Sequence, residues 1–228
     1  MPRKARQKSK TGIYHVIVRG INRQDIFHDD EDRKRFLETL CRVSKESNSE
    51  VFGYCLMSNH VHLLIKEGDS GISHAMKRLG TSYAYWYNWK HEHTGHVFQD
   101  RFKSECVEND TYLMTVIRYI HRNPVKAKLV LNPDHYNWSS CRVYYGMREN
   151  PPGLTQTQLI LGLFEEQKEK AVERMRFFEA EDNDDQCLDD FKQKRLSQEI
   201  ARQVIAEKLN GRPIGELRLI PPDERKKS

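Results

Sequence analysis

The chain lacks the features that would place it in a membrane or in an oxidising compartment. Among its 228 residues, no apolar run approaches the ~20 residues that a membrane span needs. The basic residues 1–10 are not followed by the apolar stretch of a secretory signal. The five cysteines are odd in number, widely spaced and never arranged as C-x-x-C, which argues against a disulfide framework or a zinc ribbon. We therefore expect a cytoplasmic protein that has no membrane partner.

Two further absences narrow the function. There is no G-x-x-x-x-G-K-[ST] loop, so the sequence gives no sign of a nucleoside triphosphate site. There is also no internal repeat. Charged residues make up 31% and hydrophobic residues 37% of the chain, but ten Tyr, nine Phe and three Trp are enough to build a core. The length suits one large domain or a domain with an appendage.

Positive charge is concentrated in the first part of the chain. Residues 1–150 carry 24 Lys and Arg against 17 Asp and Glu, a net charge of +7, whereas residues 151–228 carry 14 against 16, a net charge of −2. A basic region rich in aromatic residues is typical of proteins that bind phosphates and stack on bases. A basic surface that is merely solvated would explain the charge equally well.

Patterns of apolar residues predict an alternation of strands and helices. Strands are expected at residues 14–19, 51–57, 60–65 and 102–107. Helices are expected at residues 30–43, 72–89 and 110–123, and Pro124 should stop the last of them. The order β-α-β-β-α-β followed by a helix is the ferredoxin-like split βαβ pattern. We expect an α+β fold whose antiparallel sheet carries helices on one face.

A break in composition divides the chain. Pro151, Pro152 and Gly153 mark a boundary, and residues 159–180 and 187–209 beyond it are predicted to form charged helices. We expect a basic flexible arm at 1–12, a main domain at 13–150 and a charged C-terminal α-helical extension at 151–228.

The most informative short motif is a pair of histidines, His60 and His62, with one apolar residue between them. Residues i and i+2 of a strand point to the same face, so both imidazoles project together and can hold one divalent cation. Two histidines on a half-solvated strand, without a metal, are the plainer interpretation. The spacing alone does not decide between them.

The predicted helix at 110–123 carries a second pair, Tyr119 and Asn123. They lie one helical turn apart and share a face, next to an apolar stripe that should face the sheet. A phenol can be a nucleophile, and a carboxamide can give an oxygen ligand to a hard cation. On an isolated helix, a core aromatic and a residue that merely precedes a proline would be the favoured interpretation.

Taken in order, several segments resemble the single-tyrosine HUH endonucleases and, within them, the REP-associated tyrosine transposases. The matching segments are YHVIVRG at 14–20, MSNHVHLLI at 57–65, FQDRFKS at 98–104, YLMTVIRYIHR at 112–122, NPVKA at 123–127 and WSS at 138–140. The resemblance implies a nuclease domain with His60 and His62 as metal ligands and Tyr119 as nucleophile. The third ligand of that family is commonly glutamine; here it is Asn123, which is one methylene shorter and either ligates directly or acts through water.

The resemblance also implies a reaction, in which Mg²⁺ or Mn²⁺ polarises the scissile phosphate of single-stranded DNA. The Tyr119 oxygen attacks phosphorus and gives a 5′-phosphotyrosine and a free 3′-hydroxyl. Attack by another 3′-hydroxyl rejoins the strands, so no nucleotide fuel is needed. The implied partner is DNA with hairpin-forming palindromic repeats, met at the nucleoid during transposition or repeat dispersal. A monomer is favoured, and the oligomeric state stays open.

Polar and cationic side chains near the ends of the predicted elements are candidate DNA contacts. They are Arg19, Asn22, Arg23, Arg101, Lys103, Arg122 and Lys126. The five aromatic residues within 83–89 cannot all face inward, which leaves one or two to stack on bases. Two alternatives remain open: a catalytically weak protein that binds DNA or RNA hairpins on the same fold, and a metal-dependent hydrolase that uses water.

Overall fold

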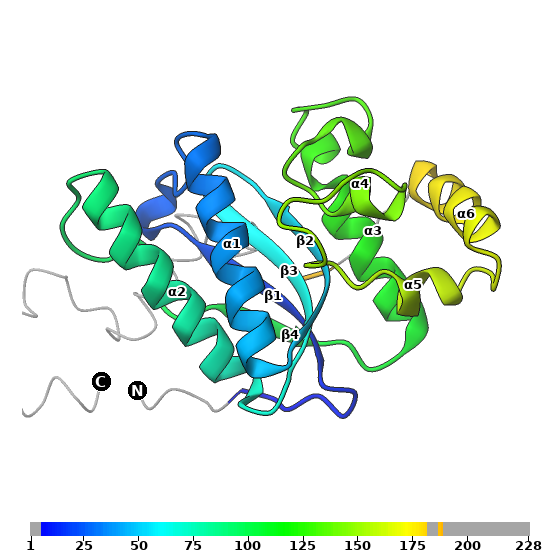
Figure 1. Cartoon of the computed structure of the whole chain (residues 1–228), viewed down its shortest axis with the longest axis horizontal. Helices are drawn as coiled ribbons and strands as arrows, with labels where there is room; N and C mark the ends of the chain where they lie inside the picture. Colours follow the sequence, from blue (N-terminus) through cyan, green and yellow to red (C-terminus); the bar gives the residue numbers. More distant parts are fainter. Residues whose placement is uncertain (1–5, 182–186, 189–228) are drawn as a thin grey trace, which may run out of the picture. The chain divides into compact units, whose positions relative to one another are not determined.

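The centre of the molecule is a four-stranded sheet. The computed structural model describes residues 6–181 and 187–188. The strands are β1 (Ile13–Arg19), β2 (Glu50–Leu56), β3 (His60–Lys66) and β4 (Lys103–Cys106), in the order β2-β3-β1-β4. Neighbouring strands are antiparallel (Figure 1). With α1 (Asp30–Ser47) and α2 (Gly71–Lys90) in the two connections, this is the ferredoxin-like α+β fold, so the predicted fold class is confirmed.

Helix α1 begins where the sequence predicts because its first residues cap one another. The Asp29 carboxylate accepts a hydrogen bond from the backbone N–H of Asp32 at 2.9 Å, and the Asp32 carboxylate accepts one from the backbone N–H of Asp29. Such reciprocal capping satisfies N–H groups that have no partner within the helix. The helix ends at Asn48, whose φ of 53° is left-handed. It is therefore one turn longer than its apolar spacing predicts.

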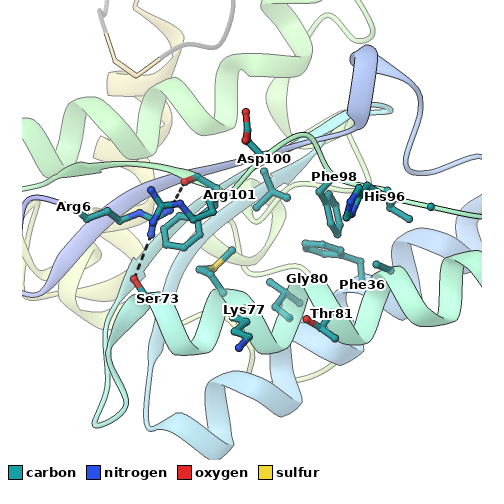
Figure 2. Close-up of a pocket in the computed structure, with 17 residues that line it drawn as sticks. Arg6, Phe36, Ser73, Lys77, Gly80, Thr81, His96, Phe98, Asp100 and Arg101 are labelled. Atoms are coloured by element: carbon teal, nitrogen blue, oxygen red, sulfur yellow. Dashed lines mark hydrogen bonds between the residues drawn. The ribbon is translucent and has the colours of Figure 1, made fainter. Parts of the chain in front are cut away.

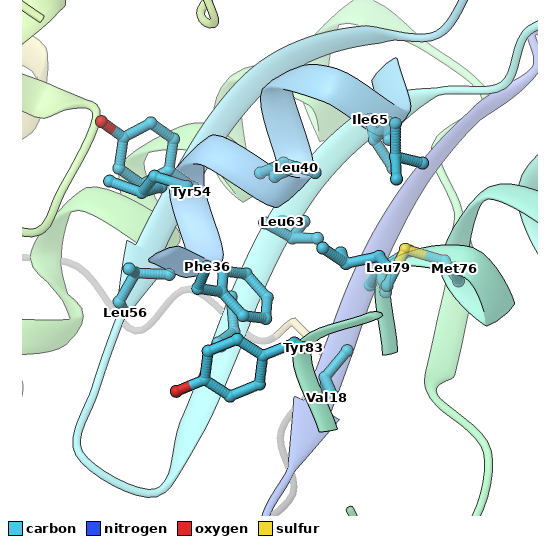
Figure 3. Close-up of a cluster of buried hydrophobic side chains, with 14 of the residues drawn as sticks. Val18, Phe36, Leu40, Tyr54, Leu56, Leu63, Ile65, Met76, Leu79 and Tyr83 are labelled. Atoms are coloured by element: carbon cyan, nitrogen blue, oxygen red, sulfur yellow. The ribbon is translucent and has the colours of Figure 1, made fainter. Parts of the chain in front are cut away.

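Helices α1 and α2 pack against one face of the sheet. Alternate residues of the central strands point to this face, among them Val18 of β1 and Leu63 of β3. They meet Phe36 of α1 and Leu79 and Tyr83 of α2 (Figure 3). Burying each large apolar side chain contributes roughly 1.5–3 kcal/mol. This layer therefore holds β1 and β3 rigidly from behind.

The opposite face of the sheet is covered by α3 (Asp110–Lys126). Its predicted apolar stripe does face the sheet, since Leu113, Ile117 and Ile120 pack with strand residues such as Leu64. Gly53 of β2 permits the close approach, because a Cβ built there would lie 2.4 Å from Cδ1 of Ile117. The prediction that helices cover one face of the sheet is therefore correct for α1 and α2. The later part of the chain adds a second layer, which covers the other face (Figure 1).

The prediction that the helix ends at Asn123 is wrong, because α3 continues through Pro124 to Lys126. A proline removes one backbone N–H from a helix. Here it stands in the last turn, where the N–H of Ala127 still donates to the carbonyl of Asn123 at 2.9 Å. Too little helix follows Pro124 for the lost bond to end it.

The single helix predicted for 159–180 is also wrong. The structure has two helices, α5 (Gln158–Gly162) and α6 (Lys168–Ala180). Gly162, a weak helix former, ends the first of them. Both helices bury apolar residues beside α3, including Ile160 and Met175.

The segment after α3 also closes the outer edge of β2. It contains η2 (Pro133–His135) and α4 (Cys141–Tyr144). The N–H of Leu56 donates to the carbonyl of Trp138 at 2.9 Å, and the N–H of Ser140 donates to the carbonyl of Tyr54 at 3.0 Å. Pairing of this kind protects a sheet edge that could otherwise bind another chain.

The division of the chain into an arm at 1–12, a main domain at 13–150 and an extension at 151–228 stays a prediction. The described residues belong to one compact unit, Met1–Leu188, and within it Arg6 of the expected arm donates a hydrogen bond to the carbonyl of Phe102. Residues 189–209 of the second predicted extension helix lie outside the described residues.

None of the five cysteines, all of which lie in the described residues, forms a disulfide. No helix within residues 6–181 is long and apolar enough to cross a membrane.

Candidate active site

Strand β3 presents His60 and His62 on the face that α3 covers, as the strand spacing predicts. Val61 and Leu63 of the same strand point the other way, into the core beneath α1 and α2. The centroids of the two imidazole rings are 5.1 Å apart, and the rings are nearly perpendicular at 79°. Both residues are buried.

Helix α3 brings Tyr119 against this pair. The Tyr119 ring packs edge-on to His62, with centroids 5.6 Å apart and an angle of 75°. The Nζ of Lys126 lies 4.7 Å from the centroid of the Tyr119 ring. One turn after the tyrosine, Nδ2 of Asn123 donates to the Tyr119 carbonyl at 3.1 Å. The Oδ1 of Asn123 is then the atom of that side chain able to ligate a cation.

Each histidine of the pair is held through its Nδ1. The Nδ1 of His60 donates to Oδ1 of Asn59 at 2.7 Å, and Nδ2 of Asn59 donates in turn to the carbonyl of Arg23 at 3.1 Å. The Nδ1 of His62 lies 3.1 Å from Nε2 of His15. A neutral imidazole that donates through Nδ1 carries its lone pair on Nε2. The Nε2 of His60, and the Nε2 of His62 when its Nδ1 donates to His15, are therefore the atoms suited to a cation.

His15 of β1 and Asn59 are site residues that sequence reasoning missed. The register pairs Ile17 with His62, so His15 lies on the same face as His62 and diagonal to it. The His15 ring stacks on His62 at 5.3 Å and meets the edge of Tyr119 at 5.9 Å. The only available signal was that His15 shares strand parity with Arg19, and the pairing of β1 with β3 cannot be read from the sequence.

Burial keeps the imidazoles of His15 and His62 neutral. Desolvation lowers the pKa of His15 from 6.5 to about 3. Desolvation also lowers the pKa of His62 well below 6.5, and the neighbouring His15, His60 and Arg19 lower it further. Neutral imidazole is the form that binds a metal ion, so the environment suits a ligand.

The predicted DNA-binding residues do not all gather at this site. Arg19 pairs in register with His60, Lys103 pairs with Ile17 beside His62, and Lys126 covers Tyr119. Arg23 follows Asn22 in η1 (Ile21–Arg23), and its carbonyl meets Asn59 beside His60. Arg122 lies against the carbonyl of Glu179, and Arg101 lies at a pocket on the other face.

That pocket has a volume of about 520 Å³ and lies between α2 and residues 95–102 (Figure 2). Val18, whose side chain belongs to the layer beneath α1 and α2, forms part of its wall. Arg6 crosses one end, where it donates to Oγ of Ser73 and to the carbonyl of Phe102. The pocket is therefore separated from the histidine pair by the sheet.

Helix α2 divides its aromatic residues between core and surface. Tyr83 and Tyr87 are buried, whereas Tyr85 and Trp89 are 81% and 74% exposed. The two exposed rings are one turn apart and share a face of the helix. They are the residues of this helix that could stack on a base.

A second cluster of metal-ligating types lies beside α6. The ligand atoms of His121, Cys141 and Glu179 are all within 4.8 Å of one another, and the three residues are buried. His121 contacts Glu179 Oε1 through Nδ1 and Ser140 Oγ through Nε2, at 2.5 and 2.8 Å. The Cys141 thiol and the Tyr145 hydroxyl donate to the other Glu179 oxygen. These mutual hydrogen bonds hold α6 against α3 and engage both nitrogens of His121.

A family model and two solved structures are similar to this chain. The family model described as "Transposase IS200 like" matches residues 8–123. A structure described as a REP-associated tyrosine transposase bound to a REP hairpin matches with 19% identity and a TM-score of 0.55, over 68% of this chain and 89% of that chain. A crystal structure of a candidate transposase from Deinococcus radiodurans R1 has 20% identity and a TM-score of 0.38, over 53% of this chain and 97% of that chain. No curated protein matches the chain.

Proposed function

This chain belongs to the IS200-like transposase family, and from that premise we propose that it nicks and rejoins single-stranded, hairpin-forming repeat DNA through a 5′-phosphotyrosine on Tyr119. The observation that carries the proposal is the convergence of His60 and His62 of β3 with Tyr119 of α3. The Tyr119 ring lies 5.6 Å from the His62 ring, and the His62 ring lies 5.1 Å from the His60 ring.

The residues present fit a divalent cation. Two imidazoles engaged at Nδ1 can offer their Nε2 atoms, and Asn123 offers an amide oxygen one turn beyond the nucleophile. Oxygen donors from the amide and from a phosphate are those that Mg²⁺ and Mn²⁺ prefer. When bound there, the cation polarises a non-bridging oxygen of the scissile phosphate.

The chain's own residues perform the exchange. The Tyr119 hydroxyl loses its proton and forms a bond to phosphorus, while the bond from phosphorus to the 3′-oxygen breaks and leaves a 3′-hydroxyl. Another 3′-hydroxyl reverses the step. A phenol has an ordinary pKa of about 10, so a bound cation or a neighbouring base must help to form the phenolate.

The proposed substrate is recognised by charge and shape. Arg19 and Lys103 lie on the histidine face, Lys126 lies over the Tyr119 ring, and these three are proposed to hold phosphates. Asn22, Arg23, Arg101 and Arg122 are proposed as further DNA contacts, Arg101 from the other face of the sheet. A hairpin is favoured as substrate because the similar solved transposase is bound to a REP hairpin. We propose residues 13–150 as the nuclease domain, residues 151–228 as its extension and residues 1–12 as an additional basic arm.

The test uses a hairpin-forming single-stranded DNA with a 5′ extension, taken from repeats that flank the gene. The protein is incubated with this DNA and Mn²⁺ and run on a denaturing gel. We expect a covalent protein–DNA band that disappears with EDTA and with Tyr119→Phe. Tyr145→Phe is the matched control for loss of a partly buried phenol outside the site and should keep the band.

One observation favours a second function, a hairpin-binding protein with weak or absent cleavage. Asn123 is shorter than the glutamine of the family pattern, and its Nδ2 is engaged by the Tyr119 carbonyl. Tight binding of the hairpin without any covalent band, across several metals and repeats, would support that alternative.

A further inference from the structure

We propose that His15 is a positioning residue, which holds the His62 ring in place and accepts the hydrogen bond that His62 donates through Nδ1 when a divalent cation occupies its Nε2. The proposal rests on the proposed function only in taking His62 as a metal ligand. The role proposed for His15 is exercised through Nδ1 of His62, which its Nε2 meets at 3.1 Å.

The geometry gives His15 little freedom to do anything else. It is fully buried, its Nε2 lies 3.1 Å from Nδ1 of His62, and the two rings stack at 5.3 Å with an angle of 25°. Both residues belong to the two central strands, which pair directly in the register Ile17 to His62. Rotation of the His62 ring would break both the hydrogen bond and the stacking.

The two ligands of the pair are positioned by different chemistry. The Asn59 oxygen that meets Nδ1 of His60 can only accept, so the proton of His60 is fixed on Nδ1. Nε2 of His15 can either donate to or accept from Nδ1 of His62. The tautomer of His62 is therefore adjustable, whereas that of His60 is not.

Without metal, His15 and His62 have a preferred arrangement of their ring protons. Among the described residues, Nδ1 of His15 is buried and has no hydrogen-bond partner. Leaving a buried lone pair unmatched costs less than leaving a buried N–H unmatched, so His15 should donate through Nε2 and leave His62 protonated on Nε2.

A cation at Nε2 of His62 reverses this arrangement. His62 must then carry its proton on Nδ1 and donate to His15, whose own proton moves to Nδ1. Each ring keeps one proton throughout, so the change is an exchange of tautomers without net uptake or release. Hydrogen bonds of this kind to metal-bound histidines orient the ring and raise its basicity.

The first test needs no substitution. Nitrogen-15 NMR of the histidine rings is recorded on the full-length protein with EDTA and then with Mg²⁺. We expect His62 to change from a proton on Nε2 to a proton on Nδ1, with His15 changing in the same titration. A His62 ring that keeps its proton on Nε2 in saturating Mg²⁺ would overturn the proposal.

The second test compares His15→Gln with His15→Phe by Mn²⁺ titration followed by electron paramagnetic resonance. The phenylalanine keeps the ring but offers no acceptor, and Mn²⁺ affinity should fall about 10- to 100-fold. The glutamine oxygen can accept from Nδ1, and its affinity should stay within about threefold of the original protein. Ile17→Val, which alters packing directly across from His62, is the control and should leave affinity unchanged.

Equal affinity of the phenylalanine variant and the original protein, or an equal loss in Ile17→Val, would refute a positioning role. The outcome is separable from the proposed function. Metal binding with the tautomer exchange, but without a Tyr119 adduct, would refute the proposed nuclease function and leave the role of His15 intact. An adduct that forms normally in His15→Phe, with unchanged Mn²⁺ affinity, would support the nuclease function and refute the role of His15.

Discussion

Asn123 is the residue at which the proposed metal site departs from the family pattern. Its amide is one methylene shorter than glutamine and is tied by Nδ2 to the Tyr119 carbonyl. Asn123→Gln should strengthen Mn²⁺ binding and raise the adduct yield, because the longer side chain extends further towards the histidines. Asn123→Ala should lower both about tenfold. Equal Mn²⁺ affinity in all three proteins would mean that residue 123 is not a ligand.

The buried histidines make the metal-free protein sensitive to acid. The pKa of His15 is about 3 in the folded state and near 6.5 when unfolded. Above pH 6.5 both states are neutral and the stability is complete. Between pH 6.5 and pH 3 only the unfolded state takes up the proton, so the free energy of unfolding falls by about 1.4 kcal/mol per pH unit for this residue.

Urea denaturation in EDTA at pH 7 and pH 5 measures this effect. The original protein should lose about 2 kcal/mol more between these two pH values than His15→Phe does. The pKa of His62 is lowered too, and this residue should add a loss of the same sign in both proteins. An identical loss in the two proteins would contradict a neutral, buried His15.

At the scale of elements, the approach of α3 to the sheet depends on a glycine in β2. A Cβ on Gly53 would meet Cδ1 of Ile117 at 2.4 Å, so Gly53→Ala should push α3 outward and destabilise the fold by about 1–3 kcal/mol. Gly162→Ala is the control, since a Cβ there meets nothing within 4 Å. That change should be neutral or stabilise by up to about 1 kcal/mol. Urea denaturation of both variants measures the difference.

The elements that the sequence predicted well are those with a local cause. Apolar spacing located α1, α2 and the four strands, and it oriented α3 correctly towards the sheet. The end of α3 was predicted wrongly because the helix-breaking effect of Pro124 was given too much weight. The single helix over 159–180 was predicted wrongly because the weak helix propensity of Gly162 was given too little weight. The outer edge of β2, closed by a segment more than 80 residues later, had no local signal at all.

The residues of the candidate site also divide into those that local spacing predicts and those that only the fold brings together. Strand parity and helical spacing were enough to put His60 beside His62 and Tyr119 beside Asn123. His15 lies 47 residues from its partner His62, and only the register of β1 against β3 brings them together. Arg101 and Arg122, which their charge predicts as DNA contacts, lie at the pocket on the other face and against α6, and their contact with DNA stays a prediction.

For the molecule as a whole, the uneven charge predicts how DNA affinity depends on salt. Lys103 and Lys126 are exposed residues at the histidine face. If each contacts a phosphate, Lys103→Gln with Lys126→Gln should make the slope of log affinity against log salt shallower by about 1.4. Lys45→Gln, on α1 and so on the other face of the sheet, is the control and should leave the slope unchanged. Parallel slopes for all proteins would remove these two lysines from the DNA contact.

Packing on both faces of the sheet supports the central claim. The two histidine ligands proposed for the cation lie on a central strand that is packed between two layers of helices, and the nucleophile and Asn123 lie on the helix that covers them. Chemistry at a phosphate needs such fixed positions more than it needs flexible loops.

The central claim, a 5′-phosphotyrosine at Tyr119, is tested most directly with DNA labelled separately at each end. After incubation with Mn²⁺, the adduct is digested with protease and the nucleotide-bearing peptide is identified by mass spectrometry. We predict that the 3′-end label becomes linked to the peptide containing Tyr119, while the 5′-end label is released on a fragment with a free 3′-hydroxyl. Release of both labels from the protein, with cleavage undiminished in Tyr119→Phe, would contradict the account and indicate hydrolysis by water.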